Sequence, residues 1–337
     1  MSSSQLFEIY HKTSGILLTC TFVINFTLIY LTVFHAPNLF GTYRHFITTF
    51  AVFGILFSSL EFLLKPLLYI GTYSVVIFSL DFSVGKSSVF STFMLAIFTG
   101  FHSSMLSLIS IQFLYRYWSI SSTGILFEKG RFSIWIVSVF FGGFIWAVFT
   151  YEAIFCTAPD IKQLKFQLEN SYDLEIRHLN CIKMEAVSSD GQHFVSSSLF
   201  YLVIFTALLL IKLAIMILCG LKMAYQVYKR SSFQSSRHHK QHSLFLRSVS
   251  IQLLTPIVIL YLPTFILSYL PFTNNIEGTI IPILTVYPLI DSIIVLSIIS
   301  DYKITLQDAY NRIMWYFRNG NNQEETPINM TTLFSSI

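Results

Sequence analysis

Long runs of apolar residues recur along the chain, separated by shorter polar segments. A helix needs about 20 consecutive, mainly apolar residues to cross the hydrocarbon core of a bilayer. Seven runs approach or exceed this length: Gly15–Phe34, Phe46–Leu67, Val89–Tyr115, Phe132–Phe155, Leu199–Leu221, Ser248–Leu270 and Thr279–Ile299. The pattern predicts an all-α fold in which seven transmembrane helices form a bundle.

Leu67–Leu80 is a further, moderately apolar stretch. It is short, follows Pro66 directly and contains Gly71. We interpret it as an interfacial loop, with an eighth span as the alternative.

After the seventh run, apolar residues between Ile304 and Phe317 recur near helical spacing, opposite a polar face. This pattern predicts a short amphipathic helix on the membrane surface. Residues 319–337 are polar and are expected to be a disordered tail. The chain thus divides into an N-terminal segment 1–14, a membrane domain 15–318 and the tail.

Composition agrees with a membrane protein. Residues with apolar side chains make up 54% of the chain and charged residues only 11%, whereas about 25% of a soluble domain is charged. No metal-binding Cys/His spacing, phosphate-binding glycine loop or catalytic motif is present. We therefore expect no enzyme activity, no cofactor, no metal and no nucleic-acid partner.

Lys and Arg are concentrated between the third and fourth spans, between the fifth and sixth, and after the seventh. The fifth-to-sixth connection contains no acid and carries Lys222, Lys229, Arg230, Arg237, Lys240 and Arg247. Because basic residues favour the cytoplasmic side, this predicts the N-terminus outside and the C-terminus inside.

The longest connection, Cys156–Phe194, then lies outside. It could be a lid or vestibule over the bundle, or a solvated loop without a role. Cys156 and Cys181 are the two outer cysteines, and an oxidising compartment favours a disulfide between them. Cys20 and Cys219 lie within spans and should stay reduced.

Ionisable side chains inside the hydrocarbon are candidate functional groups because they are costly to bury. Asp291 follows Pro288 in the seventh span, and Asn25 in the first span is a candidate partner for it. We favour a polar switch over a structural clasp. Pro256, Pro263, Pro282 and Pro288 weaken the sixth and seventh helices and suggest movable segments.

Lys212 lies deep in the fifth span, too far from the inner surface for its side chain to reach. We expect a partner inside the bundle, with Gln252 and Tyr117 both possible. Glu61 and Lys65 have the spacing of a local ion pair. His102 is interpreted as a satisfied bundle residue rather than a ligand contact.

Several short motifs occur in a characteristic order. They are Phe40-Gly41-Thr42-Tyr43-Arg44, Gln112-Phe113-Leu114-Tyr115-Arg116-Tyr117, Gln252-Leu253-Leu254-Thr255-Pro256, Tyr261-Leu262-Pro263, Tyr287-Pro288-Leu289-Ile290-Asp291 and Asp301-Tyr302-Lys303. In order and spacing they resemble the nematode serpentine chemoreceptors of the Str class and their close relatives, from about Ser14 to Tyr302.

The resemblance implies a G-protein-coupled receptor in the plasma membrane of sensory cilia, which detects a small odorant or pheromone. Tyr115, Arg116 and Tyr117 occupy the place of the acidic-Arg-aromatic triplet of such receptors and would contact the G protein. The acid is absent here, and Ser292 replaces the Pro that often follows the helix 7 Asp.

Ligand binding in the outer half of the bundle would shift an inactive–active equilibrium. Aromatic residues of the bundle are the candidate ligand contacts: Phe93, Phe101, Tyr201, Phe205, Tyr261, Phe265 and Tyr287. The expected partners are a small-molecule ligand, a heterotrimeric G protein and membrane lipid. The alternative function is a seven-helix ligand-gated channel or transporter, which the charge distribution and the lack of inverted repeats disfavour.

Overall fold

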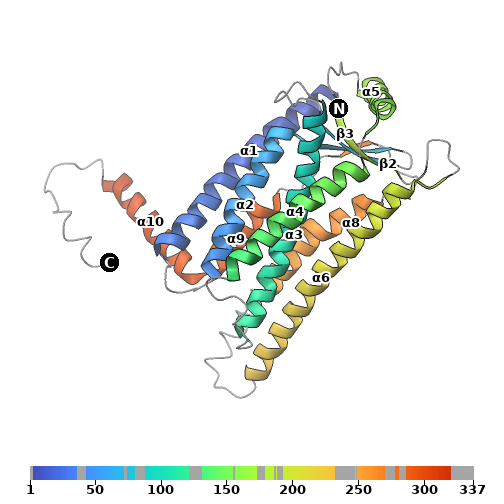
Figure 1. Ribbon diagram of the computed structural model, residues 1–337. Helices are drawn as coiled ribbons and strands as arrows, with labels where there is room; N and C mark the ends of the chain where they lie inside the picture. The colour runs from blue at the N-terminus through green and yellow to red at the C-terminus, as the bar shows by residue number, and fades with distance from the viewer. Residues whose placement is uncertain are drawn as a thin grey trace.

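Most of the chain is helical in the computed structural model, which describes residues 3–35, 43–71, 74–79, 88–120, 131–154, 156–172, 179–185, 187, 193–231, 247, 249–269, 278–280 and 286–319 (Figure 1). Six helices of this part are long and apolar enough to cross a bilayer: Lys12–His35, Tyr43–Leu64, Phe90–Ser119, Phe132–Ala153, Ser196–Lys229 and Val249–Tyr269. They correspond to the first six predicted spans, which are confirmed as membrane-length helices.

The helix of the seventh predicted span, α9, covers only its second half. Helix α9 runs Val286–Ile298, and its 13 residues rise about 20 Å at 1.5 Å per residue. The hydrocarbon core is about 30 Å thick. Gly278–Ile280 form strand β4 instead of beginning a helix, and residues 281–285, with Pro282, lie outside the described part.

Helix α1, Ser3–Tyr30, begins well before the predicted Gly15 and continues into a π-helical turn, Leu31–His35. Much of the predicted N-terminal segment 1–14 is therefore helix. Helix α2, Tyr43–Leu64, is followed by Lys65, which has a φ of 46°. Pro66 cannot donate a helical hydrogen bond, so the helix stops there rather than at Leu67.

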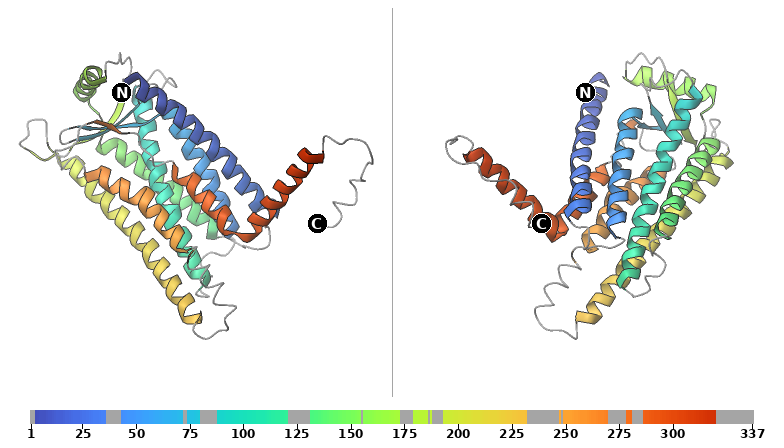
Figure 2. Two further views of the ribbon diagram at one scale, coloured as in Figure 1. Left: turned by 180° about the vertical axis from the view of Figure 1, so that it is seen from behind. Right: turned by 60° about the vertical axis from the view of Figure 1, so that its left-hand side comes forward.

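Helix α10, Ser300–Asn319, is longer than the predicted amphipathic helix and extends away from the bundle at the end opposite the N-terminus (Figure 2). Ile304, Tyr310 and Met314 are exposed along it. This leaves an apolar surface that suits a lipid bilayer. The remaining tail residues, from 320 on, lie outside the described part.

A four-stranded antiparallel sheet at the N-terminal end of the bundle corrects the all-α prediction. Its strands are β1 (Leu67–Gly71), β2 (Ser74–Ser79), β3 (Asn180–Glu185) and β4, in the order β3-β2-β1-β4. The described parts of the predicted segment Leu67–Leu80 are thus strands, not an interfacial loop or an eighth span. Its Val, Ile, Tyr and Phe residues favour extended pairing.

Helix α5, Ala158–Tyr172, lies beside this sheet (Figure 1). We call β1–β4 together with α5 the cap. Cys156 and Cys181 form a disulfide, which ties β3 to the end of helix α4, Arg131–Ala153. The described part of the outer connection thus includes a helix and a strand, and its role as a lid stays a prediction.

Helix α3, Ser88–Ile120, packs against α2, α4 and α6, Ser196–Ser231. The contact between α3 and α4 is close because Gly100 and Gly143 face each other: a Cβ on Gly100 would lie 2.5 Å from the Gly143 carbonyl oxygen. Small residues allow this approach of helix backbones in membranes.

The sixth span contains an irregular segment between its two prolines. Residues Ile257–Tyr261 are π-helical, directly after Pro256, and α8 continues from Leu262 to Tyr269. Missing proline N–H groups and π-turns both weaken the regular hydrogen-bond ladder, so the helix can bend here.

Candidate functional site

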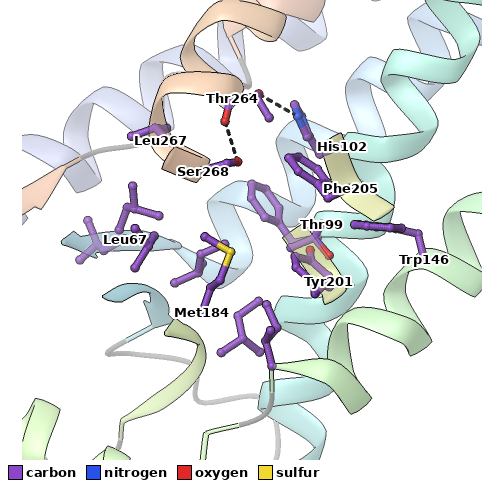
Figure 3. Close-up of a pocket in the computed structure, with 16 residues that line it drawn as sticks. Leu67, Thr99, His102, Trp146, Met184, Tyr201, Phe205, Thr264, Leu267 and Ser268 are labelled. Atoms are coloured by element: carbon purple, nitrogen blue, oxygen red, sulfur yellow. Dashed lines mark hydrogen bonds between the residues drawn. The ribbon is translucent and has the colours of Figure 1, made fainter. Parts of the chain in front are cut away.

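A cavity of about 130 Å³ lies directly beneath the cap (Figure 3). Strands of the cap form one wall, and α3, α4, α6 and α8 form the others. Its lining is mainly apolar and consists of Leu67, Leu68, Val75, Ile77, Phe98, Thr99, His102, Trp146, Ile154, Ile182, Met184, Tyr201, Phe205, Thr264, Leu267 and Ser268. A concave apolar site with a few polar groups is typical of small-molecule binding.

Hydrogen bonds between helices fix the polar groups of the cavity wall. His102 Nε2 and Thr264 Oγ1 are 3.1 Å apart and join α3 to α8. The Tyr201 hydroxyl lies 3.2 Å from Thr150 Oγ1 on α4, to which Thr99 donates a bond of 3.3 Å. Hydrogen bonds thus link α3 to α8 and to α4, and α4 to α6, around the cavity.

His102 keeps an unused hydrogen-bonding nitrogen. Its Nδ1 atom is buried and has no hydrogen-bond partner in the described part of the chain. An unsatisfied buried polar atom is costly, so a ligand or water that reaches Nδ1 would be favoured. The interpretation of His102 as a satisfied bundle residue is wrong in one respect, because only one of its two nitrogens is bonded in the described part. The side chain lines the cavity, and whether it contacts a ligand stays a prediction.

Two of the seven predicted ligand contacts, Tyr201 and Phe205, line the cavity. Trp146 on α4 contacts both, with ring centroids 5.1 Å and 5.5 Å away. Thr99 and Trp146 were not singled out from the sequence. The spacing of Thr99 and His102 on one helix face was the available signal for Thr99.

The other five predicted contacts do not line this cavity. Phe93 packs edge-on against Tyr151, and Phe101 stacks on Phe53. Phe265 is 40% exposed and lies against Tyr269. Periodicity placed these rings on helices, but it did not give the rotation of each helix.

Tyr261 and Tyr287 lie deeper in the bundle. The Tyr261 hydroxyl is 3.4 Å from Ser110 Oγ on α3, and the Tyr287 hydroxyl donates a 3.2 Å bond to Asp291. Both tyrosines are buried in the main core instead of facing the cavity. The Tyr261 contact reaches α3, whereas the Tyr287 bond lies within α9.

An ion-paired cluster holds the outer strand of the cap in place. Lys183 Nζ lies 2.9 Å from Asp160 and 3.1 Å from Glu185. Partial burial alone would raise the pKa of Asp160, but hydrogen bonds from Thr157 and Lys183 outweigh it and lower that pKa. Burial alone would lower the pKa of Lys183, but the two carboxylates outweigh it and raise that pKa.

Asn25 and Asp291 do not form the predicted hydrogen bond in the described part. The Asn25 Oδ1 atom accepts a 2.7 Å bond from Ser292, the next residue, and its Nδ2 donates to the Thr21 carbonyl. Successive helical residues point about 100° apart, so Ser292 faces α1 while Asp291 bonds Tyr287.

Pro288 lies in the same region, against α2. A Cβ on Gly54 would come within 2.8 Å of the Pro288 Cβ. Gly54 is therefore the residue that permits α9 to approach α2 at its proline. The switch role predicted for Asn25, Asp291 and Pro288 stays a prediction.

Lys212 has a partner inside the bundle, but neither of the two considered. Its Nζ donates to the Ser103 carbonyl oxygen at 3.0 Å and to Ser103 Oγ at 2.9 Å. Gln252 is instead bonded to Arg116. The lysine thus connects α6 to α3.

Arg116 connects three helices at the end of the bundle from which α10 extends. Its guanidinium donates to Gln252 Oε1 in the sixth span and to the Tyr43 hydroxyl on α2. It also lies over the Tyr43 ring, 4.9 Å from the centroid. We call Arg116, Gln252 and Tyr43 the arginine clasp.

The tyrosines beside Arg116 have separate contacts. Tyr115 stacks on Tyr43, with ring centroids 6.1 Å apart, and Lys222 of α6 lies 5.6 Å from the Tyr117 ring centroid. The triplet therefore touches three neighbouring helices. Of the basic residues in the predicted cytoplasmic connections, Lys129, Arg237 and Lys240 lie outside the described part.

Comparisons with known proteins agree with this architecture. Residues 10–307 match the model of a family described as serpentine type 7TM GPCR chemoreceptor Str. The chain is 26% identical over 299 residues to the G-protein coupled receptor str-33 of Caenorhabditis elegans, covering 86% of this chain and 87% of that protein.

Two further relatives are named serpentine receptor class r-10. The Caenorhabditis elegans protein is 24% identical over 308 residues, with 86% of this chain and 87% of the relative covered. The Caenorhabditis briggsae protein is 23% identical over 307 residues, with 85% and 86% covered.

Proposed function

Because this chain belongs to the Str family of serpentine seven-transmembrane chemoreceptors, we propose that it detects a small odorant or pheromone in the cavity beneath the cap. Ligand binding would then activate a heterotrimeric G protein at the opposite end of the bundle. It is a multi-pass membrane receptor of a family not known for enzymes.

The cavity is the observation that carries the proposal. Its volume of about 130 Å³ is close to that of an engineered apolar cavity of about 150 Å³ that binds benzene. The lining offers apolar contact on every side and only a few hydroxyl groups and one imidazole. These properties suit a compact, mostly apolar organic molecule.

We place the cap outside the cell and the arginine clasp inside, in the plasma membrane of a sensory cilium. A disulfide in the cap fits an oxidising exterior, and the basic connections at the other end fit the cytoplasm. An epitope at the C-terminus should therefore be stained only after permeabilisation, whereas staining of intact cells would favour an inverted channel.

Receptor activation would release the arginine clasp. In the arrangement described, Arg116 is bonded to α2 and to the sixth span, which holds these helices together. A ligand that binds the cavity better in a second arrangement shifts the population towards it. The π-helical segment after Pro256 is the place where the sixth span can bend.

The test is a ligand screen in cells that express the full chain, with calcium or cAMP as the readout. Met184→Trp would fill the cavity from β3 and should raise the EC50 of any agonist by about tenfold or more, equal to about 1.4 kcal/mol. Phe166→Trp is the control, because Phe166 lies on α5 of the cap and is 66% exposed. Unchanged potency of the Met184 variant at equal surface level would rule out this cavity as the ligand site.

A further inference from the structure

The ammonium group of Lys212 lies just below the floor of the ligand cavity. It bonds Ser103, the residue that follows His102 of the cavity lining on α3. Trp146 and Phe205 line the cavity and also a second, small cavity of about 10 Å³, in which Lys212 and Ser103 take part. The paired rings of Trp146 and Phe205 therefore separate the two cavities.

The side chain of Lys212 points towards the cap. The Lys212 carbonyl oxygen accepts a 3.1 Å bond from Ser110, so its backbone lies level with Ser110 on α3. Its Nζ, however, bonds Ser103, which lies about two turns nearer the cap along α3. A lysine that snorkelled to the inner surface would extend the other way.

The charge of Lys212 has no acidic counterpart nearby. No acidic side chain of the described residues lies within 4 Å of its Nζ, and two of its three N–H donors are used by Ser103 alone. An unpaired ammonium inside the bilayer costs several kcal/mol by common estimates. A group that brings a negative charge to this position would therefore be stabilised.

We infer that Lys212 and Ser103 form a subsite for the carboxylate of an acidic ligand, whose apolar part fills the cavity beneath the cap. A rotation of the Trp146 and Phe205 rings would join the two cavities and admit the carboxylate. The subsite deepens the proposed receptor function and rests on it, because it names the chemical class of the ligand.

Binding follows from ordinary charge-assisted hydrogen bonding. A carboxylate oxygen can accept the third N–H of Lys212 at about 2.7–2.9 Å and neutralise the charge. A methyl ester of the same acid has nearly the same shape but no charge, so it can fill the cavity without pairing. The preference for acid over ester therefore measures the subsite separately from the cavity.

The experiment uses the purified full-length protein in detergent and its thermal unfolding midpoint. Hexanoate, benzoate and phenylacetate are compared with their methyl esters at equal concentration, since a ligand that binds the folded state raises the midpoint. We expect at least one acid to raise it by about 2 °C or more above its ester. Lys212→Met should abolish the difference.

Lys222→Met is the matched control. It removes a positive charge from the same helix at an exposed position and should keep the preference for the acid. Equal stabilisation of the unmodified protein by acids and esters would overturn the carboxylate subsite while leaving the cavity as a ligand site. If Lys212→Met does not fold, this comparison on the unmodified protein decides alone.

No stabilisation by any of the six compounds would overturn the subsite for acids of this size. The proposed receptor function is tested separately by the cellular screen, which includes neutral compounds of other shapes. A preference for acids that persists in Lys212→Met would show that another group binds the carboxylate and would also overturn the inference.

Discussion

Arg116 is the side chain that most directly relates the structure to signalling. In receptors with an acidic residue beside this arginine, a charged pair holds it; here neutral groups, Gln252 and Tyr43, do so. A hydrogen bond from a charged donor to a neutral acceptor contributes about 1.5–3 kcal/mol. The clasp is thus strong enough to bias the arrangement of the helices and weak enough to open.

Substitutions of the two partners in the clasp should change signalling in opposite directions. Gln252→Ala frees Arg116 and should raise ligand-independent signalling, whereas Arg116→Ala should reduce G-protein activation without changing ligand affinity. Surface level, ligand binding and second messenger are measured separately. Gln307→Ala, on the exposed surface of α10, is the control.

Normal activation by a surface-expressed Arg116→Ala variant would show that Arg116 does not couple to the G protein. Unchanged basal signalling in Gln252→Ala would show that the clasp does not restrain activation.

Asp291 is the acidic side chain at the centre of α9. It is buried and accepts a bond from Tyr287. Asp291→Asn keeps the shape and the acceptor oxygen but removes the charge. We expect a shift in agonist potency of about tenfold, equal to about 1.4 kcal/mol, at a nearly unchanged surface level, as measured by dose–response curves and surface labelling.

Tyr287→Phe provides the comparison for Asp291, because it removes the hydrogen bond and keeps the carboxylate. Equal signalling by Asp291→Asn and the unmodified receptor at matched surface level would defeat the switch role of this residue.

Sequence reasoning at this scale succeeded where topology alone decided. Cys156 and Cys181 were expected to pair because they are the two cysteines on the predicted outer, oxidising side, and they are bonded in the structure. The partners of Asn25 and Lys212 depend on how each helix is rotated about its axis. A hydrophobic pattern does not tell whether Asp291 or the next residue, Ser292, faces Asn25.

Among the elements, the close contact between α3 and α4 requires glycine at position 143. A Cβ on Gly143 would overlap Ser104 Oγ of α3, whereas a Cβ on Gly142 would meet nothing within 4 Å. Gly143→Val should therefore separate the helices and lower the thermal midpoint strongly, since overpacking costs about 1–3 kcal/mol or more. Gly142→Val adds the same atoms one residue away and should be tolerated.

Thermal unfolding of both variants in detergent, together with their surface level in cells, checks this prediction. Equal loss of stability in the two variants would mean that the close approach of α3 and α4 is not what Gly143 provides.

The cap should depend on pH through Asp160. Its pKa is lowered in the folded protein, so its contribution is present above the ordinary Asp pKa of about 3.9 and is lost as the pH falls through the lowered value. Lys183, whose pKa is raised, loses its contribution only in strongly alkaline solution. The pair therefore stabilises the cap across the neutral range.

Asp160→Asn should lower the free energy of opening of strands β2 and β3 at pH 7, as measured by hydrogen exchange. The decrease should be about 1 kcal/mol or less because the pair is partly exposed. Near pH 3 the difference from the unmodified protein should shrink. A difference that stays constant from pH 7 to pH 3 would contradict a role for the Asp160 charge.

The long helices could be predicted because the bilayer imposes both their length and their apolar character. The cap could not, because its strands pair segments far apart in sequence, such as β1 with β4. No local pattern in Leu67–Ser79 distinguishes a strand that is buried under a helix bundle from a short membrane segment. The pairing of Gly278–Ile280 with β1 likewise has no local signal, and it replaces the predicted start of the seventh helix with a strand.

At the scale of the whole molecule, α3 and the sixth span connect the cavity with the arginine clasp. His102 and Thr264 join these two elements at the cap end, and Arg116 and Gln252 join them at the other end. The π-helical segment Ile257–Tyr261 lies between the two contacts on the sixth span. A ligand that disturbs the first contact can thus change the second through one bendable element.

Between the cavity and the clasp, α3 contributes buried apolar side chains such as Met105, Leu106 and Ile109. Polar contacts of Ser103 and Ser110 with Lys212 lie beside them. In the proposed receptor, coupling between the two ends would travel through the relative position of these helices. The partner that reads this position is proposed to be a G protein.

Nucleotide exchange by a purified heterotrimeric G protein, in the presence of the full-length protein in lipid nanodiscs, tests this claim most directly. An agonist found in the cellular screen should raise the exchange rate severalfold, and Met184→Trp should remove that effect at the same agonist concentration. An agonist that binds the nanodisc protein but leaves exchange unchanged, with a panel of G proteins that includes nematode subtypes, would contradict the proposed coupling between cavity and clasp.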